Sequence, residues 1–205
     1  PMTLATDWVL AALCVYFATR LGMRAAPRRE AVTLWAWAFV ATGAAAVLGG
    51  AYHGFGPEMR LSAADALWRG AMVCAGATSM FMLCAAVRAS CGRPWRTWWL
   101  VLAKVKFLAY AALVAWSDDY RFAVYDTIGS MALVLLFQGL EVLRGKLPTL
   151  GWMAVAMIIS VAAALVQRSI ARLGPFNHND IYHVIQMASL WFFYRAGRGL
   201  QDAVD

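Results

Sequence analysis

The sequence predicts an all-α integral membrane protein, a bundle of seven transmembrane helices. Apolar residues make up 62% of the chain and charged residues only 14%, and the mean hydropathy is +0.61. A soluble domain is closer to half apolar and a quarter charged. A transmembrane helix needs about 20 apolar residues, and a helix together with its loop takes about 29 residues. A chain of this length therefore has room for about seven transmembrane helices. We therefore expect one membrane domain over 1–205, with Pro1 as a cloning remnant in front of Met2.

Seven apolar runs, each bounded by a polar or helix-breaking segment, predict the seven helices. The expected spans are 6–21, 32–53, 62–87, 98–116, 122–143, 150–167 and 179–194. The breaks fall at the basic stretch 24–29, GFGP at 54–57, CGRP at 91–94, SDD at 117–119, the segment 144–148 and Gly174-Pro175. Glycine, proline and charge clusters end helices, so each break is read as a loop.

The basic residues indicate the orientation. Of the eighteen Lys and Arg residues, eleven fall in the first, third and fifth loops and the C-terminal tail. The opposite side holds four, Arg60, Arg121, Arg168 and Arg172. Because short cytoplasmic loops are enriched in Lys and Arg, we expect the N-terminus outside and the C-terminus in the cytoplasm, in a bacterial inner membrane.

All three histidines fall at the same, outer end of this topology. His53 ends the second run, and His178 and His183 open the seventh. Seven of the eleven acidic residues belong to that end as well: Asp7, Glu58, Asp65, Asp118, Asp119, Asp126 and Asp180. Ionisable groups at membrane depth are costly and usually face a cavity or one another. A cluster of imidazoles and carboxylates there indicates a metal site or a proton-handling site.

Zinc is the metal that this set of side chains favours. Neutral imidazole is a preferred zinc ligand, and a catalytic zinc keeps three protein ligands plus a water. Nearby carboxylates orient the imidazoles or take a proton from the water. Three histidines from two helices and a carboxylate from a third would supply such a site.

Three segments resemble the signature regions of the CREST superfamily, which includes alkaline ceramidases and adiponectin-receptor-type proteins. They are GGAYHGFG at 49–56, SAADALW at 62–68 and FNHNDIYHVIQ at 176–186. The resemblance implies seven helices, a zinc-dependent lipid hydrolase, His53 and His183 as zinc ligands, and Asp65 as the residue that holds the metal-bound water. The FNHNDIYH segment also resembles the signature of a bacterial membrane family without an assigned activity.

The sequence departs from the superfamily pattern in two places. The superfamily has HxxxH in its last helix, but Asn179 stands four residues before His183, and the histidine is His178. An i,i+5 pair points about 140° apart on a regular helix. His178 therefore becomes the third ligand only if it precedes the helix, as Gly174-Pro175 favours. The second departure is Gly49, where the superfamily often has serine.

Supporting residues and structural alternatives complete the expected site. The candidates for a supporting or alternative ligand role are Asp180, Asn179, Asp119, Asp126 and Tyr52. Asn177, Asn179 and Asp180 also suit a helix N-cap. Asp65 and Arg69 are spaced for a salt bridge along one helix face, and Asp126 faces either the site or a basic partner.

Two function classes remain open from the sequence, both with membrane lipids as partners. The first is a zinc-dependent intramembrane hydrolase of a lipid amide or ester. The second is a non-catalytic membrane sensor or binding protein with a structural metal, and a histidine-ligated haem is a weaker third option. The basic residues are divided among loops, so no nucleic-acid partner is expected. The sequence leaves the oligomeric state open.

Overall fold

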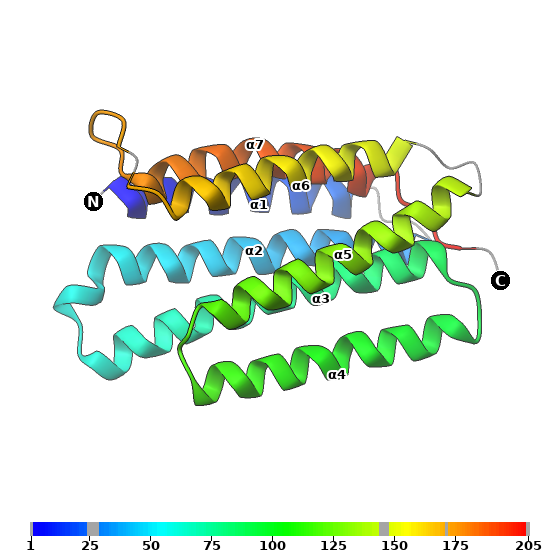
Figure 1. The fold of residues 1–205 in the computed structure, drawn as a ribbon, viewed down its shortest axis with the longest axis horizontal. Coiled ribbons are helices and arrows are strands. Elements are labelled where there is room, and N and C mark those ends of the chain that lie inside the picture. Colours follow the sequence, from blue (N-terminus) through cyan, green and yellow to red (C-terminus); the bar gives the residue numbers. More distant parts are fainter. Residues whose placement is uncertain (1, 24–28, 144–147, 171, 204–205) are drawn as a thin grey trace.

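The computed structural model describes residues 2–23, 29–143, 148–170 and 172–203 and consists of seven α-helices (Figure 1). The helices are α1 (Met2–Gly22), α2 (Glu30–Phe55), α3 (Leu61–Ser90), α4 (Trp95–Trp116), α5 (Arg121–Leu143), α6 (Pro148–Gln167) and α7 (His178–Arg198). A short 3-10 turn, η1 (Gly56–Glu58), joins α2 to α3. The predicted membrane bundle is confirmed, and every expected span lies inside one of these helices.

Six helices, α1 to α6, are long and apolar enough to cross a membrane, judged on the residues that the structure describes. α7 has 21 residues, as many as α1, but its first three turns hold polar residues between His178 and Gln186. It packs against α1 on one side and α6 on the other. The polar part of α7 is therefore covered by neighbouring helices.

The helices form a ring that is closed by α1 and α7. In chain order, α1 packs on α2, α2 on α3, and α3 on both α4 and α5, while α6 packs on α7. Figure 1 shows the N-terminus, the α2–η1 corner, the α4–α5 turn and the loop around Gly174 at its left end. The C-terminus lies at the right end. The odd-numbered helices therefore all begin at the left end, which we call the histidine end because all three histidines lie there.

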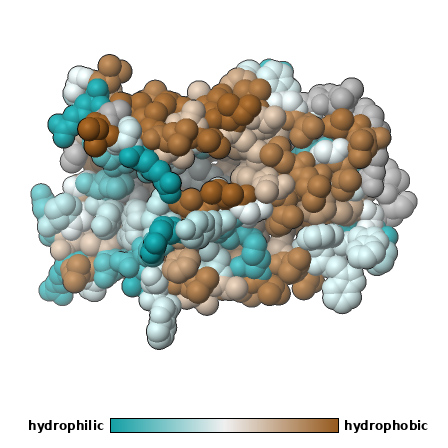
Figure 2. Space-filling model, in the orientation of Figure 1, coloured by the Kyte–Doolittle hydropathy of each residue, from teal (hydrophilic) through white to brown (hydrophobic). Residues whose placement is uncertain are grey.

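The outer face of the bundle is apolar, as a lipid-facing surface requires. On α4 the large side chains Val101, Leu102, Val105 and Leu108 are exposed. Figure 2 shows hydrophobic side chains across the middle of one face and more hydrophilic ones toward the histidine end. The buried core lies chiefly among α1, α2, α3, α5 and α7. A second, smaller cluster joins α3, α4 and α5.

The opposite end is fastened by the C-terminal tail, which caps α2. The carboxylate of Asp202 accepts hydrogen bonds from the backbone N–H groups of Glu30 at 3.0 Å and Ala31 at 2.8 Å. The helix itself supplies no side-chain cap at Arg29. The first backbone N–H groups of a helix have no partner within it. Two of those at the start of α2 therefore bond to a residue more than 170 positions away.

Replacing Asp202 with alanine is expected to lower the free energy of unfolding by about 0.5–2 kcal/mol, the range for loss of a helix cap. The thermal unfolding midpoint of the detergent-purified protein measures this. Gln201→Ala, a change at the exposed neighbouring position, is the matched control and should leave the midpoint within the error. Equal midpoints for the two variants would show that the tail contributes no cap.

Candidate functional site

His183 is the centre of a buried polar cluster that joins α7 to α1. Its Nδ1 atom lies 3.0 Å from the hydroxyl of Thr6, and its Nε2 atom lies 3.2 Å from Oδ1 of Asp7. The exposed fractions are 8% for Thr6, 5% for Asp7 and 7% for His183. Both ring nitrogens of His183 are thus engaged by adjacent residues of the first helix.

Two carboxylate oxygens of this cluster have no hydrogen-bond partner among the described residues. They are Oδ2 of Asp7 and Oδ1 of Asp180, and both are buried. Asp180 is 0% exposed, and it interacts electrostatically with Asp7. A buried carboxylate oxygen without a partner is costly, so the cluster has unused capacity to bind a proton or a cation.

Local sequence explains why Asp180 is fixed at the start of α7. Asn177 is the N-cap, and its side chain accepts hydrogen bonds from the N–H groups of Asn179 at 2.8 Å and Asp180 at 3.1 Å. Asp180 Oδ2 accepts the N–H of Asn177 at 2.8 Å. This reciprocal pair is a capping box. The predicted capping role is therefore confirmed, and it uses only one of the two oxygens of Asp180.

Two glycines beside His53 allow α1 to approach α2 closely at the cluster. A Cβ atom on Gly50 would lie 2.8 Å from Cβ of Asp7. A Cβ on Gly54 would lie 2.8 Å from the Leu4 side chain. The GGAYHGFG motif thus has a packing role in addition to any chemistry of its histidine, because larger residues would push the first helix away.

His53 lies near this cluster, on the side of an aromatic group. Its ring is 5.6 Å from Tyr52 and 6.5 Å from Trp68, measured between centroids. It interacts electrostatically with Asp180 and with His183. The structure therefore brings His53, His183 and Asp180 to one region, as the sequence predicts, and Tyr52 packs beside them.

His178 does not join them in the predicted way. It is the first residue of α7, directly after the N-cap Asn177. Both His178 and His183 therefore lie on the helix. On that helix His178 and His183 point about 140° apart. The condition for a shared metal, that His178 precedes the helix, is not met, and Asn179 is likewise a first-turn residue whose N–H serves the cap.

Asp65 lies half-buried in the second turn of α3 and makes no ion pair with Arg69 among the described residues. The Arg69 guanidinium instead donates to the carbonyl oxygens of Val114, at 3.2 Å, and Ala115. The salt-bridge alternative for Asp65 is therefore wrong. Asp65 remains one turn from Trp68, the aromatic neighbour of His53.

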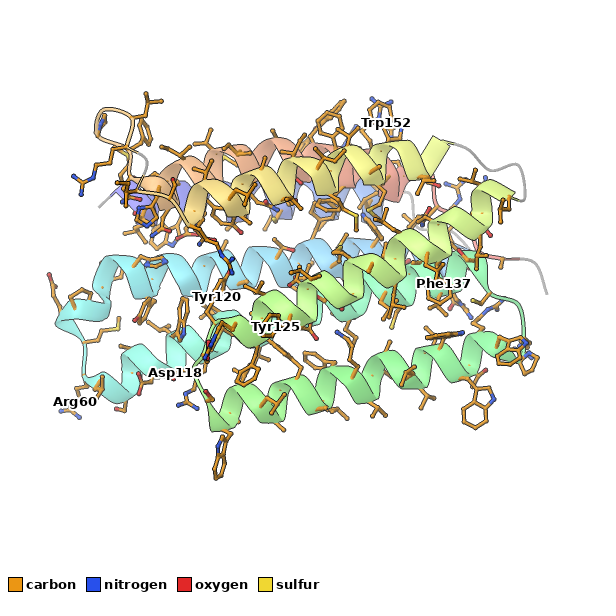
Figure 3. All side chains as sticks on the ribbon, in the orientation of Figure 1. Arg60, Asp118, Tyr120, Tyr125, Phe137 and Trp152 are labelled. Carbon is orange, nitrogen blue, oxygen red and sulfur yellow. The ribbon has the colours of Figure 1, made fainter. Side chains whose placement is uncertain are left out.

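The other two predicted supporting carboxylates have partners of their own. Asp119 pairs with Arg121 at 2.6 Å in the α4–α5 turn, and these hydrogen bonds lower the pKa of Asp119. Figure 3 shows its neighbours Asp118 and Tyr120 in this turn, at the histidine end. Asp126 pairs with Lys106 of α4 at 2.5 Å. Of the two predicted alternatives for Asp126, the basic partner is the one that the structure shows.

The predicted three-histidine set does not fit a metal in this arrangement. Among the described residues, no group of three or more His, Cys, Asp and Glu side chains stands ready to hold a metal ion. The same finding covers the buried cluster of His183, Asp7 and Asp180, so these side chains do not form a ready metal site either. What the cluster does present is two buried carboxylate oxygens without a hydrogen-bond partner among the described residues.

Neither Asp7 nor Thr6 is among the predicted site residues, although both contact His183 directly. The available signal was Asp7 itself, an acidic residue in the second turn of an apolar helix. α1 and α7 both begin at the histidine end, so residues in their second turns lie at the same depth. That the two helices are neighbours was not readable from the sequence.

Comparison with known proteins gives one family match. The model of a family of unknown function, DUF6962, matches residues 2–202, nearly the whole chain. Searches of curated proteins and of solved structures each returned no match. The helices and the histidine-end cluster described above all lie within the matched range. The chain therefore belongs to DUF6962.

Proposed function

We propose that this protein is a zinc-dependent intramembrane hydrolase that cleaves an amide or ester bond of a lipid, resembling alkaline ceramidases. In the proposed topology, the N-terminus is outside, the C-terminus is cytoplasmic, and the histidine end lies near the outer leaflet of a bacterial inner membrane. The observation that carries the proposal is the buried cluster of His183, Asp7 and Asp180, with two carboxylate oxygens that lack partners.

The residues of the chain supply binding, orientation and proton positions. The Thr6 hydroxyl donates to the carbonyl oxygen of Thr3 at 3.0 Å, so its oxygen can accept the N–H of His183 Nδ1, while Nε2 faces Oδ1 of Asp7 at 3.2 Å. His53 and His183 are the proposed imidazole ligands, and Asp65 is the proposed residue that orients or deprotonates the attacking water. Zinc, when bound, polarises a substrate carbonyl and lowers the pKa of water.

The sparse contact between α5 and α6 supports access for a lipid from the side. α6 packs extensively on α7 but touches α5 much less. Figure 2 shows a hollow between α6 and α5 on the face that it presents. Apolar side chains such as Ile128 on α5 and Ile158 on α6 are exposed on these helices. In this proposal an acyl chain enters from the bilayer between α5 and α6.

The test combines metal content with lipid hydrolysis. Detergent-purified wild-type protein is expected to contain one zinc per chain by elemental mass spectrometry and to hydrolyse one or more lipid amides or esters. His53→Ala and His183→Ala should each lose both properties, and Asp118→Ala, a change at an exposed acid of the same end, should lose neither. Unchanged metal content and hydrolysis in both histidine variants would exclude the proposal.

A second candidate function is a non-catalytic sensor or lipid-binding protein with a structural metal. The burial of the cluster favours it, because Asp180 is 0% and Asp7 5% exposed, whereas a catalytic zinc needs an open position. Loss of the folded state on chelation, without hydrolysis of any lipid by the zinc-loaded protein, would select this candidate over the hydrolase.

A further inference from the structure

The helix α4 lies at the edge of the bundle, along the lower side of Figure 1. It packs on α3 and only slightly on α5. Its buried side chains within the span are Ala103, Tyr110 and Val114, which share one face of the helix. Only 17% of the residues in its most apolar stretch are buried, the smallest share among the six helices that are apolar enough to cross a membrane. Most of the surface of α4 is therefore open to whatever surrounds the bundle.

Lys104 lies near the middle of this helix, on its open side. The residue is exposed, and no hydrogen bond or ion pair joins its ammonium group to another residue that the structure describes. Lys106, two positions further along, pairs with Asp126 of α5. Residues two positions apart on a helix point about 160° away from each other. Lys104 therefore cannot share the carboxylate that neutralises Lys106.

A lysine at this depth is costly when lipid surrounds it. The 22 residues of α4 rise about 33 Å, close to the ~30 Å thickness of the hydrocarbon core. From Trp95, at the nearer end of the helix, to Lys104 the rise is about 14 Å. A lysine near a helix end can reach the membrane surface, but its four-carbon stem does not cover that distance. Lys104 therefore needs an acidic partner within the membrane.

A second copy of this chain does not supply that partner. Every acidic residue that the structure describes lies in a loop or within two turns of a helix end, so none stands at the depth of Lys104. Asp126 is also paired already, and its side chain is only 6% exposed. A symmetric pair of α4 helices would bring two ammonium groups toward each other, and like charges repel. The charge therefore favours a partner with a different sequence.

The residues that line up with Lys104 suit close contact with another helix. They recur at alternating spacings of four and three residues, as in the seam between two packed helices. This face, which we call the Lys104 stripe, consists of Thr97, Val101, Lys104, Leu108, Ala111 and Ala115. All are exposed except Ala111, which is half-buried. The two alanines, toward the histidine end, let a second backbone approach closely.

We propose that the Lys104 stripe is a docking face for a transmembrane helix of another protein, one that carries an Asp or Glu near the middle of its span. The carboxylate pairs with Lys104 between the two helices, and the partner helix packs along α4. The pairing removes the uncompensated charge from contact with lipid. It uses no residue of the histidine end, so it does not rest on the proposed function.

The test uses synthetic transmembrane helices as probes of the full-length protein in lipid vesicles. One probe is a polyleucine helix with a single Asp at its centre, and the matched probe has Leu there. Both lack tryptophan and carry a dansyl group at each end, so energy transfer from Trp95 and Trp98, which are 68% and 70% exposed on α4, measures binding. We expect the Asp probe to bind about 5–30-fold more tightly, the range for one polar contact between membrane helices.

Variants of the stripe locate the binding. Lys104→Met should abolish the preference for the Asp probe, and Lys104→Arg, which keeps the charge, should retain it. Val105→Met, a change at the neighbouring exposed position, is the matched control. Ala115→Phe should weaken binding of the Asp probe at least about threefold by blocking close approach. Ala109→Phe, at an exposed position off the stripe, should not.

Three outcomes would overturn the proposal. The first is equal affinity of the wild type for the two probes. The second is a preference for the Asp probe that persists in Lys104→Met, since another residue would then carry it. The third is self-association of the wild type in vesicles without a preference between the probes, which would assign the stripe to a second copy. Equal unfolding midpoints establish that the variants fold alike, and Lys104→Gln replaces Lys104→Met if that variant does not fold.

Discussion

Asp126→Asn is expected to destabilise the protein by about 3–5 kcal/mol, the cost of breaking a buried ion pair by removing one partner. Lys106 lies in the middle of α4, and its ammonium group donates to Asp126 at 2.5 Å and to the hydroxyl of Ser130 at 2.7 Å. The Asp126 side chain is only 6% exposed. Without that carboxylate, the ammonium is left uncompensated inside the apolar bundle, where a lone charge is expensive.

The double variant is the control for this prediction. Lys106→Met together with Asp126→Asn removes both charges, so we expect it to be more stable than Asp126→Asn alone. Equilibrium unfolding in mixed micelles, completed as a double-mutant cycle, measures the coupling. Additive effects of the two single changes would show that the pair is not coupled and that each residue acts alone.

Gly76→Ala is expected to destabilise the protein by about 1–3 kcal/mol, the range for overpacking a close-packed core. A Cβ atom at this position of α3 would overlap the ring of Tyr110 on α4. That ring is 4% exposed, and its hydroxyl donates to the carbonyl of Met72 at 2.8 Å. The ring cannot move aside without breaking this bond, so α4 must shift away from α3.

The matched control is Gly129→Ala on α5, where a Cβ atom meets nothing within 4 Å. Alanine is a better helix former than glycine by about 1 kcal/mol, so this change should be neutral or stabilising. Thermal unfolding midpoints of the two variants, measured in the same detergent, should therefore move in opposite directions. If both variants lowered the unfolding midpoint by the same amount, α4 would pack on α3 without close contact at Gly76.

The sequence alone determined the number of helices, their approximate bounds and the end at which the histidines lie. These features are local, because a span depends on the length of one apolar run and on the breaker that follows it. The N-cap at Asn177 was predictable for the same reason. Seven alternating spans also place the end of α2 and the start of α7 at one end, which brought His53 and His183 together.

Only the tertiary structure decided which side chains meet within that end. The pairing of His183 with Asp7 depends on α1 and α7 being neighbours, and the pairing of Lys106 with Asp126 depends on how α4 and α5 are turned. The start of α7 at His178 likewise sets the direction of that imidazole. Apolar periodicity carries little of this information in a membrane, because lipid-facing and buried positions are both hydrophobic and helix packing alone selects the partners.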